Sequence, residues 1–196
     1  GIASYNNLVY PQKESFKNTR ITGELKISTK GNLIVDKSAF ENCYYMTSVD
    51  FSEQEKGACV LYDRAFSCSG ITKFTGPATT NGSFVMSGSF QECRDLETFQ
   101  TSQLSGLTNG EGSPAAFFKN CGKLKTVSFS NNYKYNSIPV EAFMNCENLT
   151  SLSLGKNPIK VKERAFYNCS KISANDVPFD IIEEIQSNAF YNCKFG

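Results

Sequence analysis

The chain has 196 residues, 40% of them apolar, and its 20 basic and 19 acidic side chains leave a net charge of +1. This balance argues against nucleic acid or an anionic membrane as the main partner, because both require a clustered basic surface. The sequence has no histidine, the commonest general base and metal ligand, and no run of eighteen apolar residues that would span a membrane.

A five-residue phrase, Ala-Phe-x-Asn-Cys, recurs along the chain. Ala39–Cys43, Ala142–Cys146, Ala165–Cys169 and Ala189–Cys193 carry it almost unchanged. Variants occupy residues 15–19, 65–68, 89–93 and 117–121, and we interpret the copy at 65–68 as one residue shorter. The phenylalanines are 23 to 28 residues apart, a period that predicts a repeat architecture. The predicted structural anchors are Phe16, Phe40, Cys43, Phe66, Cys68, Phe90, Cys93, Phe118, Cys121, Phe143, Cys146, Phe166, Cys169, Phe190 and Cys193.

Each phrase lies between two apolar patterns. Apolar residues follow the Cys at three, six and eight positions, as Met46, Val49 and Phe51 follow Cys43. The last two alternate as in a half-buried strand, so we predict one strand per repeat and a parallel sheet. The residue five before the Phe is apolar in six repeats, which predicts a short extended segment on the opposite side; these residues are Val35, Leu61, Val85, Ile138, Val161 and Ile185. We expect the Asn of the phrase to bond backbone groups at the turn.

The eight cysteines allow two interpretations. Seven of them share one repeat position, which favours a column of small, buried free thiols. A disulfide framework is the alternative, since the count is even. Cys59 lies outside the column and is either an ordinary strand residue or the one accessible thiol.

The ends and one internal stretch depart from the repeat. We expect residues 1–14 to form an N-terminal cap and residues 15–196 to form the repeats. Together they would make a single domain, 1–196. The stretch from Gln103 to Pro114 predicts a surface loop. The chain starts without Met and stops three residues after Cys193, so we expect a processed product whose final half-coil is either truncated or a cap.

Phe-x-Asn-Cys followed by x-x-Leu-x-x-Leu-x-Leu resembles the BspA-like leucine-rich repeats of bacterial and protozoan surface proteins. The resemblance runs from about Ser15 to the end, although Phe, Val or Ile often replaces Leu and no repeat has Leu-Pro after the strand. It implies a leucine-rich-repeat solenoid of the α/β or mainly β class with about eight coils. A parallel sheet would form the concave face, and short extended or irregular segments the convex side. It also implies a non-enzymatic adhesion module, extracellular or at the cell surface, with its export signal removed or outside the sequence.

In such a coil, the residues four, five and seven positions after each Cys face outward on the sheet. They are mostly small and polar, and the ligand-binding candidates among them are Lys73, Glu97, Thr98, Gln100, Lys125, Thr126, Ser128, Thr150, Ser151 and Ser153. Interface energy concentrates on Tyr, Trp and Arg, so we add candidates in rims and loops: Tyr44, Tyr45, Arg94, Tyr133 and Tyr135. The plainer interpretation is that all of these are solvated or partly packed residues.

The predicted partner is a protein or extracellular-matrix ligand, or a glycan, with no cofactor and no metal. One alternative is a structural spacer that presents other domains. Another is a solenoid that binds or cuts carbohydrate; cutting would need Asp, Lys or Arg stacked on adjacent coils, and binding is weakened because the predicted face lacks aromatic platforms. The carboxylate pairs Glu53/Glu55, Asp176/Asp180 and Glu183/Glu184 are interpreted as solvated charge.

Overall fold

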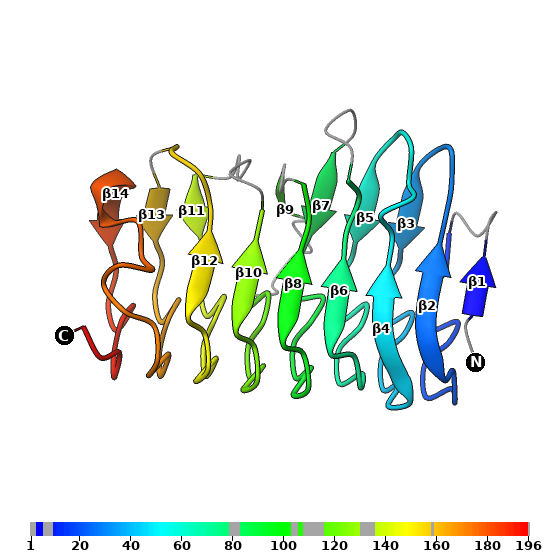
Figure 1. The fold of residues 1–196 in the computed structure, drawn as a ribbon, viewed down its shortest axis with the longest axis horizontal. Coiled ribbons are helices and arrows are strands. Elements are labelled where there is room, and N and C mark those ends of the chain that lie inside the picture. Colours follow the sequence, from blue (N-terminus) through cyan, green and yellow to red (C-terminus); the bar gives the residue numbers. More distant parts are fainter. Residues whose placement is uncertain are drawn as a thin grey trace.

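The computed structural model describes residues 3–5, 10–78, 83–102, 106–107, 116–129, 136–157 and 159–195. Over these residues the chain winds into a solenoid whose strands all pair in parallel with the coils before and after. The strands of one sheet run along the front in Figure 1, and shorter strands lie behind them. The turns that carry the repeated phrase form the lower edge of Figure 1. The predicted leucine-rich-repeat solenoid is therefore confirmed.

The front of the solenoid is a parallel sheet in the order β1-β2-β4-β6-β8-β10-β12. The alternation of apolar and polar residues forms these strands, because Leu25, Val49 and Phe74 point inward while their neighbours face solvent. The strands are β1 (Ala3–Tyr5), β2 (Gly23–Ile27), β4 (Met46–Asp50), β6 (Lys73–Thr75), β8 (Thr98–Gln100), β10 (Thr126–Ser128) and β12 (Ser151–Ser153).

Two smaller parallel sheets form the back, where the sequence predicts short extended segments. The first has the order β3-β5-β7-β9 and the second β11-β13-β14. Their strands are β3 (Leu33–Val35), β5 (Cys59–Leu61), β7 (Phe84–Met86), β9 (Gly106–Leu107), β11 (Ser137–Ile138), β13 (Ile159–Val161) and β14 (Ile182–Ile185). A 3-10 turn, η1 (Phe179–Ile181), precedes β14.

The coil count differs from the expected eight. Within the described residues, six coils have a strand on both sides. The repeat after Cys169 forms no front strand, because the Asp176 carboxylate accepts hydrogen bonds from the backbone N–H and hydroxyl of Ser173, at 3.0 and 2.6 Å, and closes a turn there. At the other end, β1 lies inside the predicted cap and pairs with β2.

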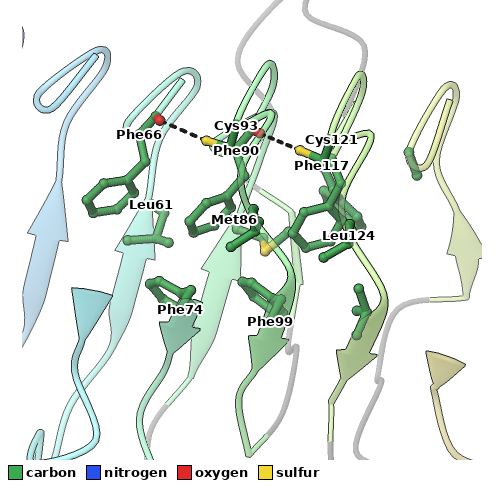
Figure 2. Close-up of a cluster of buried hydrophobic side chains, with 14 of the residues drawn as sticks. Leu61, Phe66, Phe74, Met86, Phe90, Cys93, Phe99, Phe117, Cys121 and Leu124 are labelled. Atoms are coloured by element: carbon green, nitrogen blue, oxygen red, sulfur yellow. Dashed lines mark hydrogen bonds between the residues drawn. The ribbon is translucent and has the colours of Figure 1, made fainter. Parts of the chain in front are cut away.

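The core is a column of stacked phenylalanine rings. Each anchor Phe from Phe16 to Phe190 stacks on the next, with ring centroids 5.0 to 5.8 Å apart. In the middle coils Phe74 and Phe99 from the front strands contact the column edge-on, at 4.9 and 5.3 Å from Phe90 (Figure 2). At the C-terminal end Phe179 and Phe195 pack on Phe190.

The Asn of each phrase has a different role from the expected one. Its backbone is left-handed, with φ near 60° at Asn42, Asn120, Asn145 and Asn168, a conformation that Asn tolerates better than most residues. Its side chain bonds the Asn of the preceding coil rather than the backbone. The Nδ2 groups of Asn42, Asn145 and Asn168 donate to the Oδ1 atoms one coil earlier, at 2.8, 2.6 and 2.9 Å. We call this stack the Asn ladder.

The Cys of the phrase joins coils in the same way. All eight cysteines are free, as the thiol-column interpretation predicts. The thiols of Cys93, Cys121, Cys146 and Cys169 each donate to the carbonyl oxygen of the Phe one coil earlier, at 3.0 to 3.1 Å (Figure 2). Burial raises the pKa of the Cys93 thiol to about 12, so these thiols stay protonated donors at neutral pH.

The phrase at residues 65–68 has a different register from the predicted one. Cys68 occupies the Asn position: its φ is 56°, and its N–H donates to the Gln91 carbonyl as the Asn42 N–H donates to Ser67. Ser69 takes the Cys position, with its hydroxyl 3.5 Å from the Cys93 sulfur. The missing residue therefore lies after the phrase, beside Gly70. The thiol column holds six cysteines rather than seven.

Two other expectations need correction. Met86 rather than Val85 pairs with Leu61, because the turn before Phe90 is one residue shorter than its neighbours. The predicted loop from Gln103 to Pro114 contains the back strand β9, and its remaining residues lie outside the described part of the chain. Ile185 lies in the back strand β14 as predicted, and it is 52% exposed because among the described residues no further coil covers β14. Cys59 is fully buried in β5, which settles it as a strand residue.

Candidate binding surface

The outward side of the front sheet, which we call the sheet face, carries the candidates named from the sequence. Strand register aligns them in columns, so that residues of equal repeat position lie side by side. One column is Ser48, Lys73, Thr98, Thr126 and Ser151, and the next is Asp50, Thr75, Gln100, Ser128 and Ser153. Glu97, Lys125 and Thr150 come directly before these strands. The predicted columns thus form one continuous polar surface.

The charges on the sheet face are mostly paired with each other. Lys125 contacts Glu97 at 2.7 Å, and Lys26 contacts Glu53 at 2.6 Å. The hydrogen bond from Lys125 lowers the pKa of the Glu97 carboxyl. Lys73 is exposed, and no partner is recorded for it among the described residues. The sheet face therefore has no strong field of either sign.

A second surface lies along the edge formed by the phrase-bearing turns, which we call the rim. Tyr44 and Tyr45 are 63% and 55% exposed, and the Arg94 side chain is 80% exposed. The candidates Tyr133 and Tyr135 lie outside the described residues. Of the five rim and loop candidates, the structure places three on the rim.

Two hollows flank Arg94 on the rim. The first has a volume of about 390 Å³ and is lined by Tyr44, Cys68, Ser69, Gly70, Glu92, Arg94 and Asp95. We call it the Cys68 hollow. The second, of about 410 Å³, lies on the other side of Arg94 and is lined by Asn120, Gly122, Lys123, Asn145 and Glu147. We call it the Gly122 hollow.

The sequence pattern predicts Tyr44 and Arg94 as candidates but not the residues between them. Gly70 lies against the preceding coil, because a Cβ there would come within 2.0 Å of the Tyr44 carbonyl oxygen. Gly122 is different, since no described atom lies within 4 Å of a Cβ built on it. The shortened repeat at residues 65–70 is the sequence signal for the first hollow. The missing residue was expected within the phrase, but it lies after the phrase.

Ion pairs hold the rim in place. Arg94 donates to the Glu92 carboxylate at 3.2 Å, and Lys123 bonds Asp95 at 2.6 Å. The bond to Asp95 raises the pKa of the Lys123 ammonium. Asn120 donates to Glu92 and connects the rim to the Asn ladder.

The repeat anchors do not form a site. Phe40, Phe66, Phe90, Phe118 and Phe166 are fully buried, and the thiols of the column are held in hydrogen bonds. No group of three or more Cys, Asp or Glu side chains in the described part of the chain is placed to hold a metal ion. A search of the same residues finds no helix long and apolar enough to cross a membrane.

Comparison with a protein-family model agrees with this geometry. A family model described as "BspA type Leucine rich repeat region" matches residues 10–134 and 113–195, with six copies. No curated protein matches the chain. A solved structure, a leucine-rich repeat protein from Eubacterium ventriosum, is similar over 100% of this chain and 82% of its own, with 13% identity and a TM-score of 0.49.

Proposed function

The chain belongs to the BspA-type leucine-rich repeat family, and from that premise we propose that it is a non-enzymatic binding module of a cell-surface or secreted protein. Its ligand is a protein or a matrix component, and its role is adhesion. The observation that carries the proposal is the sheet face: in-register columns of outward polar residues over five consecutive strands, β4 to β12. Solenoids use extended surfaces of this kind to bind macromolecules.

The chemistry of the side chains supports binding rather than catalysis. The buried thiols have raised pKa values, which disfavours the thiolate that a nucleophilic cysteine requires. The Glu97 carboxyl is held ionised by Lys125, the opposite of the raised pKa that a general acid needs. The paired charges of the sheet face favour a neutral or mixed-charge ligand over a polyanion.

Arrays of matrix proteins, host-cell proteins and glycans test the proposal. We expect the parent chain to bind a protein or matrix component, and Thr150→Arg with Ser151→Arg to weaken that binding about tenfold or more by placing bulk and charge on the sheet face. Both residues are exposed. Val60→Arg is the matched control, because Val60 faces outward in the middle of β5 on the back.

The outcomes separate the alternatives. A parent chain that binds none of the arrayed molecules contradicts the proposal and leaves the spacer function. Binding to glycans alone would assign a carbohydrate ligand instead. Binding that the sheet-face variants do not change would move the site away from this face.

A further inference from the structure

Several departures from the repeated phrase lie together on the rim. Cys68 stands where neighbouring coils have Asn, Ser69 where they have Cys, and Glu92 again where they have Asn. The missing residue of that coil leaves Gly70 pressed against Tyr44. All four line the Cys68 hollow. Repetition is sufficient to build the coils, so a concentrated set of departures points to a role other than folding.

Large residues and glycines alternate along the rim around this hollow. The residue after the Cys position is Tyr44, Gly70, Arg94, Gly122 and Glu147 in five successive coils. Neither glycine has a side chain, and Gly70 lines the first hollow while Gly122 lines the second. Tyr44, Arg94 and Glu147 therefore project as three posts, separated by two hollows.

Each post has capacity that the chain itself does not use. Arg94 donates one recorded side-chain bond, to Glu92, although a guanidinium has five N–H donors. The Glu147 side chain is exposed, and no partner for its carboxylate is recorded in the described residues. The Tyr44 ring is 63% exposed. The posts thus present, in order, an aromatic face, a cation and an anion.

The spacing of the posts fits an extended peptide. Neighbouring anchor rings beneath them lie 5.3 to 5.8 Å apart. Successive posts are two coils apart, so the distance between them is about 11 Å. Three residues of an extended chain span roughly 10 Å. A polyproline II conformation brings every third side chain to the same side. One peptide residue in three can therefore meet a post while the chain follows the rim.

We propose that the rim around Arg94 binds an extended peptide segment of a protein partner. The segment carries an acidic residue that pairs with Arg94, an aromatic or apolar residue three positions away against Tyr44, and a basic residue three positions away on the other side against Glu147. A bidentate bond between guanidinium and carboxylate gives the central contact its direction. The inference rests on the proposed binding function and assigns it a second surface, distinct from the sheet face.

A displayed library of random twelve-residue peptides tests this inference directly. The parent chain should enrich peptides with a central acidic residue. In these peptides an aromatic or apolar residue lies three positions to one side of it, and Lys or Arg lies three positions to the other side. Arg94→Glu should lose these peptides by about tenfold or more and instead enrich peptides with a basic residue at the centre. Such a reversal distinguishes a direct contact from a general loss of folding.

Blocking variants supply the matched control. Gly122→Tyr fills the Gly122 hollow without a backbone clash, and Gly31→Tyr adds the same ring at another open glycine, where again no described atom lies within 4 Å of a built Cβ. We expect the first to abolish enrichment of the acidic-centred peptides and the second to leave it unchanged. Absence of enrichment by the parent, or equal enrichment by Gly122→Tyr, would overturn the rim assignment. Ligand binding through the sheet face would still stand in either case, because the protein and matrix arrays test it separately.

Discussion

The coils at residues 141–193 differ from those at residues 64–95 at the rim, but the two regions share the Phe column of the core. In the first region, the amides of Asn145, Asn168 and Asn192 each donate to the Asn one coil earlier. In the second, Cys68 interrupts the Asn ladder and Glu92 replaces the next Asn. Yet the Phe column runs through both, with ring separations of 5.1 and 5.5 Å. The coils therefore keep their register where the Asn ladder is interrupted, so the rim can vary while the Phe column continues beneath it.

Substitutions in the shared Phe column should lower the free energy of unfolding most. Phe90→Ala in the irregular region and Phe143→Ala in the regular one should each lower the free energy of unfolding by about 3–5 kcal/mol. Phe90 should lie at the upper end, because Phe74 and Phe99 contact it in addition to the column neighbours. Urea unfolding followed by circular dichroism measures both. Near-parental stability of either variant would show that the column does not hold that region together.

Alkaline pH tests the thiols that bridge coils in both regions. Burial raises the pKa of Cys93 to about 12 and raises that of Cys146 as well. The folded chain keeps these protons while the unfolded chain loses them from about pH 8.5. Stability is therefore complete below about pH 8.5 and falls as the pH rises, by about 2 kcal/mol per buried thiol at pH 10.

Alanine variants assign that loss to particular coils. Cys93→Ala and Cys146→Ala should each remove about 2 kcal/mol of the difference in unfolding free energy between pH 7 and pH 10. Urea unfolding at both values provides the measurement. A parent chain equally stable at pH 7 and pH 10 would contradict the buried-thiol column.

Exchanging the residues at the Asn position between the two regions should have a smaller effect on stability. Cys68→Asn should stabilise the chain by about 1 kcal/mol, since the new amide can donate to Asn42 and Asn tolerates the left-handed backbone better than Cys. Asn145→Cys should destabilise it by about 1–2 kcal/mol, because two ladder bonds are lost. Thermal unfolding of both variants, with opposite shifts expected, is the measurement. Shifts in the same direction would mean that the ladder is not the difference between the regions.

Several elements could be predicted from single residues. Phe40, Cys43, Met46 and Val49 follow one another at fixed spacing, and all four are fully or almost fully buried as expected. The front strand expected after Cys169 was wrong, because the turn closed by Asp176 depends on one local side-chain bond that the repeat pattern does not contain. The strand β9 was also missed, since Gly106–Leu107 has no strand pattern of its own and pairs only because β7 lies beside it.

The repeat, the Phe column and the outward positions of the sheet face could be predicted from the amino-acid sequence. These follow from spacing along the chain, and many copies average out the irregularities of any one. The register of Cys68 and the two hollows beside Arg94 became visible only in the folded chain. The physical reason is that both depend on neighbouring coils: the Cys68 N–H bonds Gln91 in the next coil, and Gly70 is fixed by Tyr44 in the previous one.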